Sequence, residues 1–172
     1  MTKKIMFSDA FCLTQAVLNG SKTMTRRVLR DNVPLGNWKE TVKHLPYKVG
    51  EVVAIAQSYK EVYPNADFEM VGNGFMTESA GWNNKMFVRA SLMKRHIQFT
   101  DVKMECLQDI SEDDVLREGV FKLTDKCFLP SGTAKIFTSA REAFTYLIDK
   151  ISGKGTWESN PFVVAYSFEL VD

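Results

Sequence analysis

The 172-residue chain has few of the residues that build metal sites or disulfide frameworks. It contains two histidines and three cysteines, and the cysteines (Cys12, Cys106 and Cys127) are far apart, with no CxxC pair. Zinc sites and disulfide frameworks need several such residues at suitable spacing. We therefore expect no metal and no cofactor, and thiols that are reduced and mostly buried, as in a cytosolic protein.

The chain also lacks a long apolar run and an excess of charge of one sign. No stretch approaches the roughly 20 apolar residues of a membrane-spanning helix, and Ser8, Asp9 and Gln15 make the first segment too polar for a signal peptide. We expect a cytoplasmic protein with no membrane partner. The formal net charge is +1, from 22 basic and 21 acidic residues. That balance argues against bulk adhesion to nucleic acid but leaves room for a local basic patch.

Hydrophobic residues make up 45% of the chain, an ordinary share for a globular protein with a core. The length suits one domain, so we predict a single domain over residues 1–172. Two segments, residues 31–46 and 59–84, show no clean period and contain many residues that favour turns. We predict that both are loop insertions, and long loops are often functional.

Short strands predominate in the pattern of the chain, with short helices between them. The patterns predict strands over residues 5–7, 52–58, 86–92, 96–107 and 162–170, and helices over residues 10–18, 111–118 and 139–151. Ser111 suits the cap of the second helix, and Glu112, Asp113 and Asp114 suit its first turn because of the helix dipole. Strands and helices do not alternate as in a parallel doubly wound sheet. We predict an α+β fold.

Four segments carry a resemblance that spans the chain. They are LNGSKTMTRR over residues 18–27, YKVGEVV over residues 47–53, the strand and capped helix over residues 100–119, and WESNPF over residues 157–162. Together and in this order they resemble the ASCH family of PUA-like domains, especially its members from phages and prophages. The resemblance implies a small PUA-like β-barrel with short flanking helices and loop insertions. It says less about activity, because one fold hosts several functions.

Some small bacterial members of this superfamily are amidohydrolases that remove the acetyl group of N4-acetylcytidine with a Lys, a Thr three residues later and a Glu after a short helix. The positions similar to that set are Lys22, Thr25 and Glu118, which the resemblance would make the base, the nucleophile and the acid. A threonine hydroxyl needs such a base, and a lysine serves only when its pKa is lowered. Residues three apart on a strand point to opposite faces, however, so Lys22 and Thr25 converge only if the chain turns between them.

Basic and aromatic residues outside this set are candidates for binding nucleic acid. The candidates for contacting phosphate are Arg26, Arg27, Arg89, Lys94 and Arg95. The loop aromatics Trp38, Tyr59 and Trp82 are candidates for stacking on a base. The ordinary alternatives are a solvated basic edge strand and aromatic side chains that pin loops to the sheet.

Three hypotheses follow from these observations. The first is a module that binds RNA or a modified nucleoside. The second is a metal-independent amidohydrolase acting on an N4-acylated cytosine. The third is a phage accessory protein whose loops bind another, unidentified protein.

Overall fold

The computed structural model describes residues 2–131 and 135–172. These residues form two compact units. The first unit comprises residues 2–7, 52–98 and 170–172, and the second comprises residues 8–51 and 99–169, apart from 132–134. Within the described residues, no helix has the length and apolar character needed to cross a membrane. A single domain over residues 1–172 stays a prediction.

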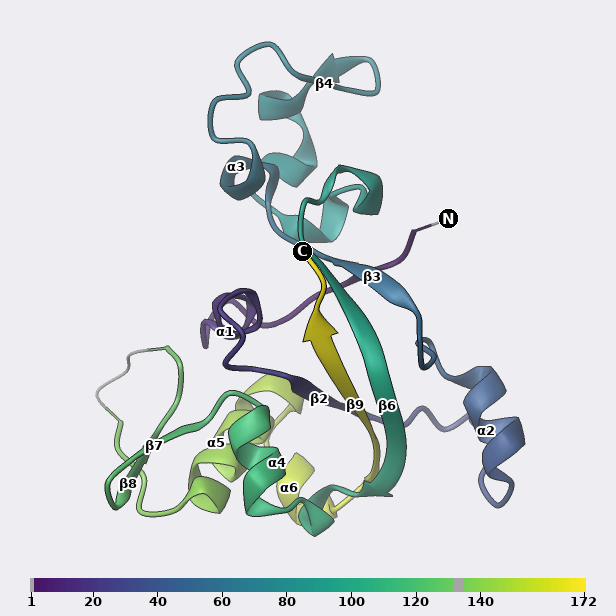
Figure 1. Ribbon diagram of the computed structural model, residues 1–172, viewed down its shortest axis with the longest axis vertical. Helices are drawn as coiled ribbons and strands as arrows, with labels where there is room; N and C mark the ends of the chain where they lie inside the picture. The colour runs from purple at the N-terminus through teal and green to yellow at the C-terminus, as the bar shows by residue number, and fades with distance from the viewer. Residues whose placement is uncertain (1, 132–134) are drawn as a thin grey trace. The chain divides into compact units, whose positions relative to one another are not determined.

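The main sheet is mixed and has five strands in the order β1-β3-β6-β9-β2 (Figure 1). Its strands are β1 (Lys4–Ile5), β2 (Met24–Val28), β3 (Val52–Ile55), β6 (His96–Cys106) and β9 (Phe162–Leu170). Strand β1 is parallel to β3, whereas β3 with β6 and β2 with β9 are antiparallel pairs. These strands and the helices between them confirm the α+β class.

The predicted β-barrel is wrong, because the sheet is open. In the described part of the chain, the edge strands β1 and β2 are each paired on one side only. A barrel requires every strand to be paired on both sides. Strand β1 is two residues long and pairs only through Lys4 and Ile5 with β3, so it has too few hydrogen-bonding groups to close the sheet.

The second unit holds most of the helices. They are α1 (Leu13–Leu18), α2 (Trp38–His44), α4 (Glu112–Arg117), α5 (Ala140–Ser152) and α6 (Thr156–Ser159), with a small hairpin of β7 (Phe121–Leu123) and β8 (Lys126–Phe128). The helices predicted over residues 111–118 and 139–151 are confirmed as α4 and α5. Each has the expected cap, since the hydroxyls of Ser111 and Ser139 accept bonds from the amides of Asp114 and Glu142. Helix α5 buries its apolar face, including Phe144 and Leu147.

The segment over residues 31–46 contains α2, which the sequence pattern did not predict. The Asn37 side chain accepts a hydrogen bond from the amide of Lys39 and so caps the helix. Thr41 is its one buried residue, and the Thr41 hydroxyl donates to the carbonyl of Pro34 at 2.5 Å. A helix anchored by a threonine has no apolar period, which explains why the pattern missed it.

The first unit has a hydrophobic cluster of its own. It contains α3 (Tyr59–Val62), the hairpin of β4 (Met70–Val71) and β5 (Gly74–Phe75), and 3₁₀ turns at Met76–Glu78, Ala80–Trp82, Lys85–Phe87 and Ala90–Leu92. The cluster consists of Ala54, Ala56, Tyr59, Ala66, Met76, Val88 and Met93. Residues 59–84, predicted to be a loop, therefore contribute a small core.

The strand predicted over residues 86–92 is wrong, because this segment forms two 3₁₀ turns. The carbonyls of Met86 and Val88 accept hydrogen bonds from the Lys4 ammonium at 2.6 and 2.7 Å. Asn84 also caps the first turn through the amide of Met86. These contacts curl the backbone around one ammonium group, and they use carbonyls that a strand would offer to a neighbouring strand.

Candidate functional site

Strand β2 divides the predicted site residues between the two faces of the sheet. Its register with β9 pairs Thr25 with Tyr166, Arg26 with Ala165 and Arg27 with Val164. Directly opposite residues of an antiparallel pair share a face, and neighbours along a strand alternate. Thr25 and Arg27 therefore lie on the Tyr166 face, while Arg26 lies on the opposite face.

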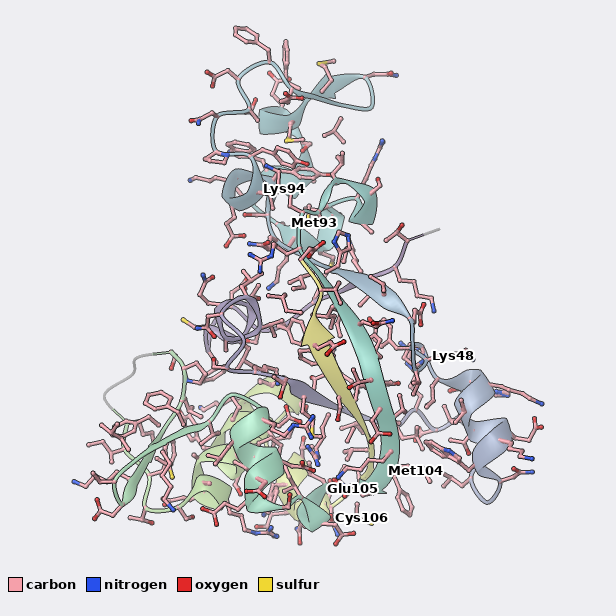
Figure 2. The ribbon with its side chains drawn as sticks, in the orientation of Figure 1. Lys48, Met93, Lys94, Met104, Glu105 and Cys106 are labelled. Atoms are coloured by element: carbon pink, nitrogen blue, oxygen red, sulfur yellow. The ribbon has the colours of Figure 1, made fainter. Side chains whose placement is uncertain are left out.

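On the Arg26 face, one guanidinium group contacts three carboxylates. The Arg26 side chain is 1% exposed; its Nη2 lies 2.5 Å from Glu105 Oε1 and 2.8 Å from Asp114 Oδ2, and its Nη1 lies 3.1 Å from Glu118 Oε1. Nη1 also donates to the sulfur of Met24. A buried cation is tolerated only when it is paired and hydrogen-bonded. These contacts tie β2 to β6, on which Glu105 lies (Figure 2), and to α4.

Lys22 and Glu118 form a second buried pair beside it. The Lys22 ammonium donates to Glu118 Oε2 at 2.7 Å, to the Glu118 carbonyl at 2.9 Å and to the Met24 carbonyl at 2.7 Å. The two residues are 2% and 4% exposed. Burial lowers the pKa of Lys22, and the neighbouring Glu118 carboxylate opposes that shift. The local fold brings them together: Lys22 precedes β2, Glu118 follows α4, and the amide of Thr23 donates to the carbonyl of Arg117.

Asp114 completes this group, which we call the ion network (Lys22, Arg26, Lys103, Glu105, Asp114, Arg117 and Glu118). Lys103 Nζ lies 2.8 Å from Asp114 Oδ2, and Arg117 Nη1 lies 3.6 Å from Asp114 Oδ1. Burial raises the pKa of Asp114, but hydrogen bonds from Lys103 and Arg26 outweigh it, so the net pKa is below its usual value. The sequence predicts for Asp114 only an interaction with the helix dipole, and it does not single out Lys103 or Glu105. Their i, i+2 spacing on a predicted strand was a usable signal of two charges on one face.

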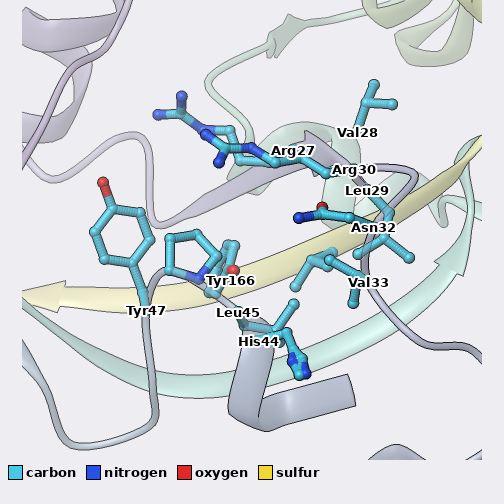
Figure 3. A pocket seen from close by; sticks show the side chains of 12 residues that line it. Arg27, Val28, Leu29, Arg30, Asn32, Val33, His44, Leu45, Tyr47 and Tyr166 are labelled. Carbon is cyan, nitrogen blue, oxygen red and sulfur yellow. The ribbon is translucent and has the colours of Figure 1, made fainter. Parts of the chain in front are cut away.

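The opposite face of β2 and β9 borders a cavity of about 610 Å³ (Figure 3). It is lined by Arg27, Val28, Leu29, Arg30, Asn32, Val33, His44, Leu45, Pro46, Tyr47, Val164 and Tyr166. The described residues that line it include two arginines and a histidine, and none of them is an aspartate or glutamate. Figure 3 shows the side chains of Arg27 and Arg30 extending in the same direction. The lining therefore favours an anionic group.

Aromatic rings form one wall of the cavity. Tyr47 stacks on Phe99, with ring centroids 4.9 Å apart, and meets Tyr166 edge-on at 5.6 Å. Tyr166 is 1% exposed, and its burial raises the pKa of its hydroxyl to about 12. The hydroxyl is therefore neutral at physiological pH. Contacts between the three rings hold the wall in a fixed orientation.

The structure brings together only part of the predicted catalytic set. Lys22 and Glu118 are in contact, but Thr25 lies on the other face of β2 from the Arg26 side chain that contacts Glu118. Thr25 is itself buried, at 5% exposure. Its hydroxyl is thus not placed for attack on a group held by Lys22 and Glu118.

The predicted ligand-binding arginines lie in three different settings. Arg27 lines the cavity, whereas Arg26 belongs to the ion network. Arg89 and Arg95 belong to the first unit, where Arg95 Nε donates to the carbonyl of Asp172 at 2.6 Å. The sequence does not single out the other polar and aromatic lining residues, namely Arg30, Asn32, His44, Tyr47 and Tyr166. Only Arg30 had a local signal, as a second arginine three residues after Arg27.

No family model matches the chain, and no curated protein matches its sequence. The chain is similar to solved structures, including the following two. The ASCH domain of Lactobacillus crispatus JV V101 has a TM-score of 0.45 and 13% identity, with 98% of this chain and 79% of that chain covered. Protein EF3133 from Enterococcus faecalis V583, of the DUF984 family model, has a TM-score of 0.50 and 17% identity, with 100% of this chain and 81% of that chain covered.

The chain shares its fold with the Enterococcus faecalis protein over its whole length, and this agrees with the resemblance read from the sequence at the level of the fold. At this identity the likeness concerns the fold alone. Activity must therefore be argued from this chain's own residues.

Proposed function

We propose that the protein binds RNA or a modified nucleoside in the cavity on the Tyr166 face of the sheet. The lining of that cavity carries the proposal, because it combines two arginines, a histidine and an asparagine with aromatic and aliphatic walls and has no carboxylate. Its volume of about 610 Å³ falls within the usual range for sites that bind small molecules. Single-stranded RNA is commonly recognised through unstacked bases held by aromatic and polar groups.

Each part of the cavity has a role in this proposal. Arg27 and Arg30 contact phosphate, because a guanidinium group matches phosphate with two parallel hydrogen bonds. Tyr47 supplies the ring against which a base packs, and Phe99 supports it from behind. Asn32 offers both a donor and an acceptor to the edge of the base.

The ion network positions this cavity from the other side of the sheet. Arg26 and Arg27 are neighbours on β2, so the contacts of Arg26 with Glu105, Asp114 and Glu118 fix the strand that carries Arg27. In this proposal Arg26 is a positioning residue and does not contact phosphate. Lys22 has the same role, because its ammonium already donates to three acceptors.

The test compares two variants that each remove one positive charge from the second unit. Arg30→Gln changes a cavity residue, and Lys39→Gln changes an exposed residue outside the cavity. Binding of a fluorescent single-stranded RNA and of nucleosides is measured at about 50 and 200 mM salt, where phosphate contacts differ in strength. We expect Arg30→Gln to weaken RNA binding and to lower the salt slope by about 0.7, while Lys39→Gln binds as the native chain does. No binding at low salt, or equal losses in both variants, contradicts the proposal.

The amidohydrolase alternative has one observation in its favour, the contact between Lys22 and Glu118. The position of Thr25 on the other face of β2 is the observation against it. An assay for cytidine release from N4-acetylcytidine decides between the two. We expect no turnover; turnover by the native chain that disappears in a folded Thr25→Val variant would establish the hydrolase instead.

A further inference from the structure

The β4–β5 hairpin of the first unit carries an apolar face that the unit itself does not cover. Phe68 is 86% exposed, Met70 is 51% exposed and Phe75 is 42% exposed. Large apolar side chains are normal on a surface when they are scattered, but a contiguous group marks an interaction site. In Figure 1 the hairpin lies at the end of this unit away from β3.

The register of the hairpin places Met70 and Phe75 on one face. Met70 lies directly opposite Phe75, and Val71 lies opposite Gly74. Val71 packs against the hydrophobic cluster of the unit, so alternation turns Met70 and Phe75 outward. Phe68 lies two residues before Met70, outside the strand, and is the most exposed of the three. We call Phe68, Met70 and Phe75 the hairpin face.

Charge identifies the kind of partner that fits this face. Asp67 and Glu69 alternate with Phe68 and Met70, and both acids are exposed. A nucleic acid stacked on Phe68 would bring its phosphates toward these carboxylates, which disfavours it. A partner that presents positive charge beside its apolar residues would complement these acids.

We propose that the hairpin face docks a protein segment that presents apolar side chains next to lysine or arginine. Phe and Met are enriched in the cores of protein interfaces, and a few such anchors carry most of the binding energy. Asp67 and Glu69 pair with the basic residues of the partner at the rim. This function is independent of the cavity and of its ligand, which belong to the second unit.

The test uses a display library of random peptides panned against the full chain. The hairpin variant carries Phe68→Ser, Met70→Ser and Phe75→Ser together, and Leu123→Ser is the matched control, because Leu123 is 64% exposed on the other hairpin. A third variant, Asp67→Lys with Glu69→Lys, keeps the apolar residues and reverses the rim charge. Thermal unfolding of each variant checks that it is folded.

We expect the native chain to enrich peptides in which apolar residues neighbour lysine or arginine. The hairpin variant binds an enriched peptide at least about tenfold more weakly, the Leu123→Ser variant binds it as the native chain does, and the charge-reversed variant selects acidic peptides instead. The proposal is overturned if no peptides are enriched, if enrichment survives in the hairpin variant, or if the native chain is a dimer and only the hairpin variant is a monomer. Loss of RNA binding in the hairpin variant would assign the face to nucleic acid and also overturn it.

Discussion

The ammonium of Lys22 lies 2.7 Å from a carboxylate oxygen of Glu118, although the two residues are 96 positions apart in the chain. Both are buried, and the same carboxylate also accepts a hydrogen bond from Arg26. The contact joins the start of β2 to the end of α4. Glu118 neutralises two buried cations at once, so the stability of the second unit depends on it.

Removing the charge of Glu118 is expected to destabilise the protein strongly. Glu118→Gln leaves the Lys22 and Arg26 cations with less compensation in a buried site, and breaking a buried pair typically costs about 3–5 kcal/mol. The free energy of unfolding in urea measures the loss. The exposed pair Lys43–Glu40, also 2.7 Å long, is the control: Glu40→Gln is expected to cost far less, because water screens exposed pairs. If both variants lost the same free energy of unfolding, burial would not determine how strongly an ion pair stabilises the protein.

The ion network is expected to lose stability in acid through Asp114. Its folded pKa lies below the usual value of 3.8, chiefly because hydrogen bonds from Lys103 and Arg26 outweigh the effect of burial. A carboxylate with a depressed pKa contributes stability above about pH 4, and this contribution is lost as the pH falls below 3.8 toward the folded pKa. Urea midpoints at pH 6 and pH 3 measure it.

The control for this prediction is the neighbouring carboxylate. Asp114→Asn is expected to lower the midpoint at pH 6 and to flatten its change between the two pH values. Asp113 is exposed on the same helix, so Asp113→Asn should leave the acid dependence as in the native chain. If the urea midpoint of Asp114→Asn changed between pH 6 and pH 3 as much as that of the native chain, Asp114 would not be the source of the acid sensitivity.

Tyr166 is expected to ionise at about pH 12. Its usual pKa is 10.0, and burial raises it. Because the folded state holds this proton more tightly than the unfolded state, stability falls as the pH rises from about 10 to 12. Ultraviolet absorbance of tyrosinate follows the titration. Tyr166→Phe should remove the step near pH 12, and Tyr63→Phe should leave it in place.

Gly81 is expected to tolerate no side chain, because Tyr59 packs against its backbone. A Cβ at Gly81 would lie 2.5 Å from Tyr59 Cε2, and Tyr59 is 1% exposed within the hydrophobic cluster of the first unit. Gly81→Ala should therefore destabilise the protein by about 1–3 kcal/mol. Gly74 has nothing within 4 Å of its Cβ position and no positive φ, so Gly74→Ala is the control for thermal unfolding. If Gly81→Ala and Gly74→Ala lowered the unfolding temperature equally, steric overlap with Tyr59 would not be the cause.

Local patterns predicted the elements whose burial is periodic. Strand β9 begins and ends where its apolar run does, and α5 follows the spacing of Phe144, Leu147 and Ile148. Helix α2 and the turns over residues 85–92 escaped prediction because a buried threonine and the Lys4 ammonium organise them, and both contacts depend on distant or polar partners. The β-barrel, which the resemblance implied, was wrong because neither the matched segments nor local periodicity determines how the strands pair at the sheet edges.

The candidate site could be predicted only in part from the sequence, for a related reason. The resemblance predicted Lys22 and Glu118 as site residues, and their side chains are in contact. The alternation of side chains along a strand had already indicated that Thr25 would lie on the opposite face of the sheet. The cavity wall, in contrast, depends on Tyr47 and Tyr166, which are distant in the sequence. No spacing rule connects a residue before β3 with one in the last strand, because only the assembled sheet places them in contact.

Side chains along β2 alternate between the two faces of the sheet, and this alternation limits which insertions and deletions the gene can accept. A one-residue insertion or deletion within Met24–Val28 would exchange the two faces of the strand. It would turn the Arg26 side chain away from the carboxylates of Glu105, Asp114 and Glu118 and the Arg27 side chain away from the cavity, so a single frame-preserving codon change would damage binding and folding together. We therefore expect length variation to be excluded from the strand.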